Sequence, residues 1–180
     1  MTPPWSRGVT LAQAAAVRSD CARATPRAGL LLQPMSEHLA SVRWIRTTAD
    51  FQYDTYDRGH VVRYGSGIEV AASAAADFKG DAARVNPEEA FVGALSSCHM
   101  LTFLAIAARK RLMVESYEDD AVGVLEKNAD GKLAVTKVVL RPRVRFATAV
   151  DPEALAKMHD SAHANCFIAQ SVRTQVEISG

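Results

Sequence analysis

The sequence predicts an α+β protein, in which antiparallel strands and helices are partly segregated along one domain. Three observations lead to this fold class. An apolar helix is expected to start at Pro87, two long strand-like segments flank a turn at Asp130–Gly131, and a second helix follows Asp151. The chain of 180 residues is long enough for one domain with a real core and too short for two ordinary domains.

Residues 1–34 differ from the rest of the chain, because they hold four arginines, one acidic residue and many Ala, Ser, Thr and Pro residues. This composition resembles a transit peptide, although it lacks the continuous apolar core of a secretory signal. We favour a simpler interpretation, a poorly ordered extension or an upstream start codon with the native start at Met35. We therefore place the domain at residues 35–180 and assign no role to Cys21.

Short strands are expected at the start of the domain. Strand-like runs occur at residues 41–47 and 51–56, and residues 60–73 predict two strands around the turn at Gly65–Ser66–Gly67. A glycine-rich turn between two such runs is typical of a β-hairpin. The small residues of 74–84 predict a loop.

The first helix has a well-marked start. Asn86 is a favourable N-cap, Pro87 a favourable first helical residue, and the acids Glu88 and Glu89 suit the positive end of the helix dipole. The apolar residues of this helix lie nearly all round its axis, which predicts a central, buried helix. They are Phe91, Val92, Leu95, Met100, Leu101, Phe103, Leu104 and Ile106. The basic run Arg109–Arg111 closes the last turn, as the dipole favours.

The C-terminal half predicts a long hairpin, a helix and a strand. Residues 116–128 and 133–147 are expected to form two long antiparallel strands joined at Asp130–Gly131. Asp151 is the expected N-cap of the second helix, and residues 167–179 predict a closing strand.

Composition argues against several classes of protein. The chain is 48% apolar and 23% charged, as soluble globular proteins are, and its net charge of +1 provides no basic field for nucleic acid. No apolar run approaches the roughly 20 residues of a membrane span. Three cysteines at distant positions do not form a disulfide scaffold, so we expect a reducing compartment, the cytoplasm.

Cys98 and Cys166 are the candidates for chemistry. Either cysteine alone is more often a small buried hydrophobe than a nucleophile. The pair is more informative, because each lies beside polar residues, in "SSCH" and "HANC", and a reactive thiolate needs groups that stabilise it. One possible use is zinc binding by Cys98, His99, His163 and Cys166. Adjacent helical residues point about 100° apart, which argues against zinc. The other use is thiol redox chemistry through a sulfenic acid and a disulfide.

The acids at the helix start have a structural interpretation, since Glu88 and Glu89 can simply satisfy the helix N-terminus. Glu88 precedes Cys98 by ten positions, about 15 Å along a straight helix. The two side chains therefore cannot touch on one such helix. A role for Glu88 at the thiol would need a bridging arginine, a broken helix or a second subunit.

The segments "NPEEAFVGALSSCHM" and "AHANCFIAQSV" together resemble the two-cysteine signature of the OsmC/Ohr family, the osmotically inducible and organic hydroperoxide resistance proteins. The intervening "YEDDAVGVLEKNADGKLAVTKVVLRPRV" is similar to the long hairpin of that family. The resemblance covers about residues 41–179 and is nearest to the OsmC-like branch.

The resemblance implies an OsmC-like fold, with antiparallel sheets packed around a long central helix in an intertwined homodimer whose active sites lie at the subunit interface. It implies a thiol-dependent peroxidase that reduces organic hydroperoxides in oxidative-stress defence. Cys98 would be the peroxidatic cysteine and Cys166 the resolving one. No metal or organic cofactor would be needed, and an external dithiol of lipoyl or thioredoxin type would be the reductant.

Glu88 matches the family's glutamate, which holds an arginine against the reactive thiol. In this chain the loop before the helix has "DFKG", with Asp77 where the OsmC arginine would fall. We expect Arg58 to serve instead, with Arg63 and Arg84 as alternatives. The competing functional hypothesis is a non-catalytic protein that binds a small apolar ligand or senses redox state. Fold alone does not decide between the two.

Overall fold

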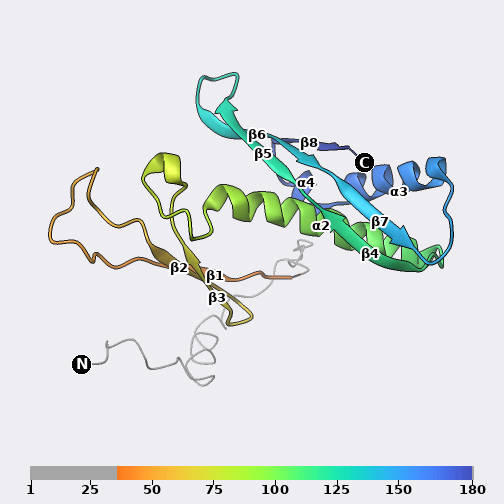
Figure 1. Cartoon of the computed structure of the whole chain (residues 1–180), viewed down its shortest axis with the longest axis horizontal. Helices are drawn as coiled ribbons and strands as arrows, with labels where there is room; N and C mark the ends of the chain where they lie inside the picture. The colour runs from red at the N-terminus through yellow and green to blue at the C-terminus, as the bar shows by residue number, and fades with distance from the viewer. Residues whose placement is uncertain (1–35, 180) are drawn as a thin grey trace, which may run out of the picture. The chain divides into compact units, whose positions relative to one another are not determined.

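The computed structural model describes residues 36–179, so Cys21 and the predicted extension at residues 1–34 lie outside the described residues. The chain divides into two units, Met1–His38 and Leu39–Gly180, and each helix and strand of the described residues lies in the second (Figure 1). The elements are β1 (Ala40–Arg43), β2 (His60–Tyr64), β3 (Glu69–Ala72), the 3-10 turn η1 (Ala76–Phe78), α2 (Pro87–Arg109), β4 (Val114–Asp119), β5 (Val122–Lys127), β6 (Leu133–Leu140), β7 (Pro142–Phe146), α3 (Pro152–Ala164), α4 (Phe167–Gln170) and β8 (Gln175–Ile178). This combination of helices and mainly antiparallel strands belongs to the expected α+β class.

The strands β1, β2 and β3 form an antiparallel sheet in that order. The predicted hairpin is confirmed, and Gly67 at φ 88° occupies the backbone region that favours glycine in its turn. The strand predicted at residues 51–56 is wrong, because the amides of Thr55 and Tyr56 both donate to the Gln52 carbonyl and form a turn. Local hydrogen bonds of Asp and Thr side chains also favour a turn there.

Helix α2 begins as predicted. The Asn86 side chain accepts from the Glu89 amide at 2.8 Å and the Glu89 side chain accepts from the Asn86 amide at 3.1 Å, a complete capping box. Burial of the helix differs from the prediction. Within one chain a single stripe is buried, formed by Leu95, His99, Phe103 and Ala107, while Leu101 is 60% exposed.

The length and apolar composition of α2 would also suit a membrane span, which corrects the expectation that no apolar segment reaches this length. The buried stripe instead packs within the folded domain. Phe103 and Ala107 contact Met158 and Ala162 of α3, while Leu95 packs on β6.

The two long strands predicted after α2 are each broken into two. Strand β4 pairs with β7 in one sheet, and β5 pairs with β6 in another. The chain changes sheet at Asp120–Ala121 on one side and at Arg141 on the other, just before Pro142. The turn between β5 and β6 is confirmed, with Gly131 at φ 74°.

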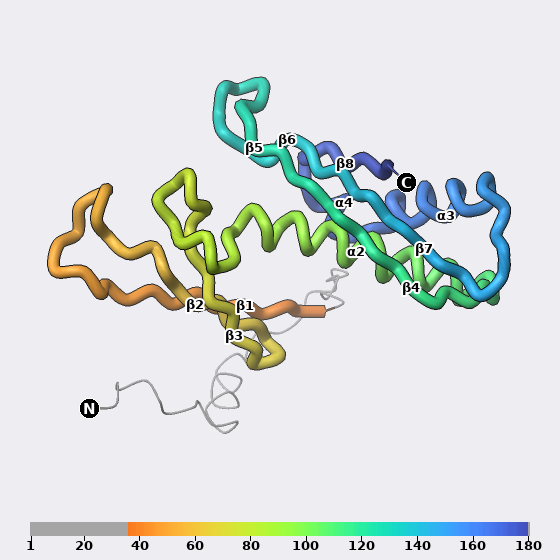
Figure 2. Tube along the Cα trace, in the orientation of Figure 1, coloured from red at the N-terminus to blue at the C-terminus, as the bar shows by residue number. Residues whose placement is uncertain are grey.

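Helix α3 starts at its predicted cap, since the Asp151 side chain accepts from the Ala154 amide at 2.9 Å. The closing strand is shorter than predicted, because residues 167–170 form the one-turn helix α4. Strand β8 then pairs in parallel with β6, beside which it runs in Figure 2.

Candidate active site

The two predicted cysteines come together where α2 meets α4. Cys98 is half-buried in the middle of α2, and Cys166 is 1% exposed at the N-cap of α4. No disulfide joins them. Burial, together with the nearby Cys98 thiol, raises the pKa of Cys166 to about 11, although the amides of Ala169 and Ile168 oppose the shift. Cys166 is therefore a neutral thiol at pH 7, and Cys98 is the more accessible of the two.

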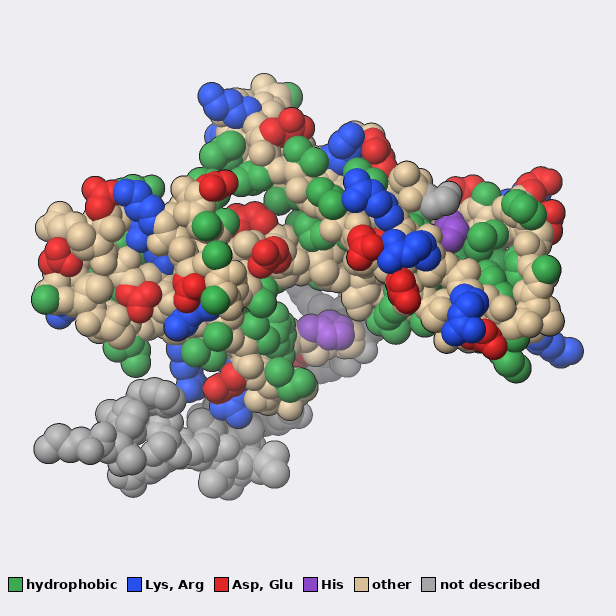
Figure 3. All heavy atoms as spheres, viewed as in Figure 1, with side chains coloured by type: hydrophobic (Ala, Val, Ile, Leu, Met, Phe, Trp, Pro, Cys, Tyr) green, Lys and Arg blue, Asp and Glu red, His purple; other side chains and the backbone are tan. Residues whose placement is uncertain are grey.

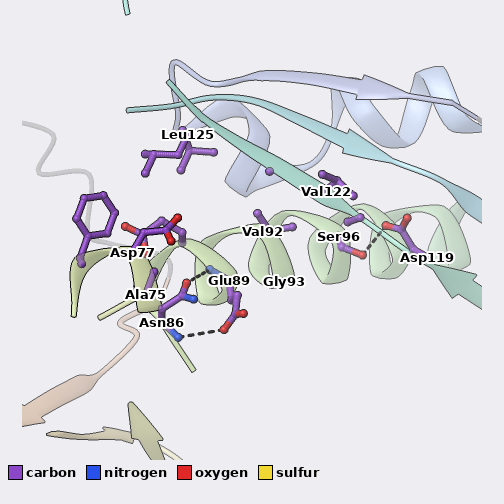
Figure 4. Close-up of a pocket in the computed structure, with 15 residues that line it drawn as sticks. Ala75, Asp77, Asn86, Glu89, Val92, Gly93, Ser96, Asp119, Val122 and Leu125 are labelled. Carbon is purple, nitrogen blue, oxygen red and sulfur yellow. Dashed lines mark hydrogen bonds between the residues drawn. The ribbon is translucent and has the colours of Figure 1, made fainter. Parts of the chain in front are cut away.

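Glu88 is half-buried in a groove of about 620 Å³ between η1, the N-terminal half of α2 and β5. Three other carboxylates line the same groove, those of Asp77, Glu89 and Asp119. Figure 4 shows Glu89 hydrogen-bonded to Asn86 at one end of the groove. Two turns further along α2, the Ser96 hydroxyl donates to Asp119 of β4. The lining residues include no Lys or Arg. Glu88 thus lies in an acidic groove with apolar walls.

Arg58 is held within its own loop. Its guanidinium donates to the carbonyls of Tyr53 at 2.6 Å and Tyr56 at 3.0 Å, and its central carbon lies 4.0 Å from the Tyr56 ring centroid. Arg84 pairs with Asp81 at 3.1 Å, and Arg63 is exposed on β2. Within residues 36–179 of one chain, none of these arginines forms an ion pair with Glu88. The predicted Arg58–Glu88 pair is not formed inside one chain.

The zinc alternative receives no support from the arrangement. Among the described residues, no three His, Cys, Asp or Glu side chains gather as metal ligands would. The Nε2 atom of His99 is engaged with His159 instead of pointing at a sulfur.

Comparison with known proteins identifies the family. The profile of the OsmC-like protein family matches residues 79–179, more than half of the chain. The chain belongs to the OsmC-like family.

Solved structures agree with this assignment. An OsmC-like protein of unknown function from Vibrio cholerae is 51% identical, with a TM-score of 0.77, and the match covers 81% of this chain and 99% of that one. An organic hydroperoxide resistance protein, OsmC, from Legionella pneumophila has a TM-score of 0.63 over 82% of this chain and 96% of that one. At 14% identity the second likeness shows the fold alone.

A curated relative, the uncharacterized protein YmaD of Bacillus subtilis, is 28% identical over 96 residues. The match spans 52% of this chain and 63% of YmaD, just under two thirds of that relative.

This OsmC-like chain also holds a buried histidine pair that the sequence analysis did not predict. His99 on α2 is 1% exposed and His159 on α3 is 9% exposed, and His99 Nε2 lies 3.1 Å from His159 Nδ1. Burial and the neighbouring His159 lower the pKa of His99 to about 4, and burial lowers that of His159. Both rings are therefore neutral at pH 7. The two positions are 60 residues apart, so no local pattern could have paired them.

Asp119 was missed for a similar reason. One of its carboxylate oxygens accepts from the Ser96 hydroxyl at 2.5 Å, and the other accepts from the Arg141 amide at 2.6 Å. Ser96 lies two positions before Cys98, and Arg141 marks the break between β6 and β7. Asp119 thus ties the cysteine-bearing helix to the place where the chain changes sheet.

Proposed function

We propose that this OsmC-like protein is a thiol-dependent peroxidase that reduces organic hydroperoxides in cytoplasmic oxidative-stress defence. One observation carries the proposal. A half-buried thiol, Cys98, lies against a buried, neutral thiol, Cys166, as an attacking and a resolving cysteine would. Membership of a family that includes organic hydroperoxide resistance proteins supports it.

The reaction has three steps: oxidation of Cys98, disulfide formation with Cys166, and reduction of the disulfide. The Cys98 thiolate attacks the terminal oxygen of ROOH, so that an S–O bond forms, the O–O bond breaks and RO⁻ takes a proton to leave as ROH. Cys166 then attacks the Cys98 sulfur. An S–S bond forms, the S–O bond breaks, and hydroxide leaves as water with the proton of Cys166. A dithiol reductant of lipoyl or thioredoxin type returns both cysteines to thiols and becomes a disulfide.

Two features support action as a homodimer. The first is the single buried stripe of α2, which leaves much of an apolar helix without cover in one chain. The second is a set of exposed apolar side chains, some of which reach the surface in Figure 3. These include Leu39, Val42, Ile45, Phe51, Leu101, Met113 and Phe167. A second copy would bury this surface.

A second copy would also explain how Arg58 can serve a site that it does not reach within its own chain. No Lys or Arg lines the groove that holds Glu88, and within one chain Arg58 bonds to its own loop instead. In the proposed dimer, Arg58 of one subunit lies between Glu88 and Cys98 of the other, stabilises the Cys98 thiolate and hydrogen-bonds the peroxide. Glu88 holds the planar guanidinium in place by bidentate pairing.

The test is hydroperoxide consumption with a dithiol reductant. Cys98→Ser should abolish turnover in a folded protein, while Cys166→Ser should consume about one equivalent and then stop. Arg58→Ala should slow Cys98 oxidation tenfold or more, and Arg58→Lys should recover little of the loss, because an ammonium lacks the fork. Full activity of Cys98→Ser would show that Cys98 is not the attacking thiol, and a wild-type protein that consumes no hydroperoxide would show that the proposed function is wrong.

Non-catalytic binding or sensing is the second candidate, and one observation favours it. Arg58 lies in an apolar, aromatic pocket of about 470 Å³ with Trp44, Phe51 and Tyr56, where it could face a small apolar ligand. Titration with an organic hydroperoxide separates the two functions. Rapid loss of two thiols per chain indicates the peroxidase, and inert thiols indicate the binder.

A further inference from the structure

The His99–His159 pair is the only side-chain hydrogen bond between α2 and α3 in the part of the chain that the structure describes. The rest of this contact is apolar, formed by Phe103 and Ala107 on α2 and by Met158 and Ala162 on α3. Apolar contacts hold two helices together but are non-directional. A hydrogen bond of 3.1 Å has a preferred geometry and fixes how far α3 is displaced along α2.

Both histidines are close in sequence to the two thiols. His99 follows Cys98 directly, and His159 precedes Cys166 by seven positions, two turns along α3 and its C-cap. A shift of α3 against α2 therefore also moves Cys166 against Cys98. Disulfide closure tolerates little displacement, since the two Cα atoms must lie within about 4.4–6.8 Å.

The bond between the two rings depends on protonation. One imidazole must donate an N–H and the other must accept with a lone pair, so two protonated rings cannot form it. The charged groups around the pair are few. His163 of α3 also lowers the pKa of His99, whereas Asp119 of β4 favours its protonation, as Asp160 of α3 does for His159. Tyr117 of β4, which contacts Phe103, has a raised pKa and carries no charge.

We propose that the His99–His159 hydrogen bond is an acid-sensitive tie that holds Cys166 in position to close a disulfide with Cys98. Both histidines are positioning residues, and neither needs to touch a reacting atom. The inference deepens the proposed function and rests on it, because disulfide closure is its resolving step. Rings released from the core regain the ordinary histidine pKa of about 6.5 and take up protons at pH 5.0. Acid therefore favours the arrangement in which α3 has moved away from α2, and the disulfide becomes less favourable.

The test is the equilibrium of the full chain with glutathione, in which protein dithiol and oxidised glutathione give protein disulfide and two reduced glutathiones. No proton appears in this balance while all thiols are protonated, so the constant should not vary with pH unless another group titrates. The constant is measured at pH 7.5 and pH 5.0, with a glutaredoxin to speed exchange, by alkylation and mass spectrometry. We expect it to fall at least tenfold at pH 5.0.

Two substitutions replace a titratable imidazole with an amide, which can still hydrogen-bond but takes up no proton in this pH range. The amide of His159→Asn replaces Nδ1, and the amide of His99→Gln replaces Nε2. Either variant, checked as folded by circular dichroism, should give a constant that is nearly the same at both pH values. His163→Asn is the matched control, one turn further along α3, and should keep the wild-type fall.

Three results would overturn the inference. They are a wild-type constant that does not change with pH, a pH dependence that survives in both His159→Asn and His99→Gln, and a dependence lost in His163→Asn. No peroxide enters this assay. Failure of hydroperoxide reduction alone would therefore reject the proposed function and leave the tie measurable.

Discussion

Replacement of Asp119 should destabilise the protein far more than replacement of its neighbour Asp120. Asp119 is half-buried and accepts two hydrogen bonds, from the Ser96 hydroxyl at 2.5 Å and the Arg141 amide at 2.6 Å. Hydrogen bonds to a charged group contribute about 1.5–3 kcal/mol each, and the bond to exposed Arg141 belongs at the lower end. Asp119→Ala should therefore cost about 3 kcal/mol of unfolding free energy. For a domain of this size that is about 10 °C in Tm.

Asp120→Ala is the matched control, because Asp120 is exposed and pairs only with surface Arg143 at 2.8 Å. Such a surface ion pair contributes at most about 1 kcal/mol. Both variants are unfolded in urea at equal protein concentration, with far-ultraviolet circular dichroism as the signal, because oligomer stability depends on concentration. The midpoint should fall without a change in slope.

A double-mutant cycle with Ser96→Ala isolates the bond between helix and sheet. We expect a coupling free energy of about 1.5 kcal/mol between Ser96 and Asp119. If Asp119→Ala and Asp120→Ala lose the same unfolding free energy within about 0.5 kcal/mol, the hydrogen bonds of Asp119 do not stabilise the protein measurably. The reasoning from these hydrogen bonds would then be refuted.

Three further predictions concern the core and the thiols. Phe103→Ala, at a fully buried side chain that stacks on His159 with 4.4 Å between ring centroids, should cost about 3–5 kcal/mol in urea unfolding. Stability should fall as pH drops from 6.5 towards 4, because unfolded His99 takes up a proton that the buried ring, with its pKa of about 4, resists. The loss should approach about 3 kcal/mol at pH 4 and shrink in His99→Gln, as measured by unfolding at each pH. Cys166 should react with iodoacetamide at pH 8 at least about 100-fold more slowly than a free thiol, since its pKa is about 11 in place of 9.0. Cys98→Ala should speed that alkylation, which peptide mass spectrometry can follow.

The helix starts were predictable because their causes are local. Asn86 and Glu89 form the capping box within four residues, and Asp151 caps α3 through an amide three positions on. The hairpin turns at Gly67 and Gly131 were predictable for the same reason, since glycine occupies a positive φ in each.

The wrong predictions concern segments whose structure depends on contacts with residues far away in the sequence. The long strands break because β4 and β7 pair in one sheet and β5 and β6 in another, which no window of sequence contains. The helical turn α4 was predicted as strand because Phe167 and Ile168 have high strand propensity, but the Gln170 amide donates to the Cys166 carbonyl.

The candidate site could also be predicted only in part. Cys98 and Cys166 were predictable from their residue type and polar neighbours, and the family resemblance indicated that they act as a pair. Glu88 was expected to lie too far along α2 to touch the sulfur, and it lines a groove whose other residues do not include Cys98. The Asp119 and His159 contacts join segments 23 and 60 positions apart, so only the folded chain reveals them.

The partners of the Cys98 helix are synthesised after it, which affects the thiols of the newly made protein. The sheet behind α2 is completed by β8, which pairs in parallel with β6 and is the last described element. Cys166 follows Cys98 by 68 positions (166 − 98), which ribosomes take about 3–14 s to translate at 5–20 residues per second. During that interval α3 is still being made, and α4 and β8 follow Cys166, so the helix carrying Cys98 lacks these packing partners. Under the proposed mechanism, a nascent chain that meets peroxide at this stage would form a sulfenic acid at Cys98 before Cys166 exists to resolve it.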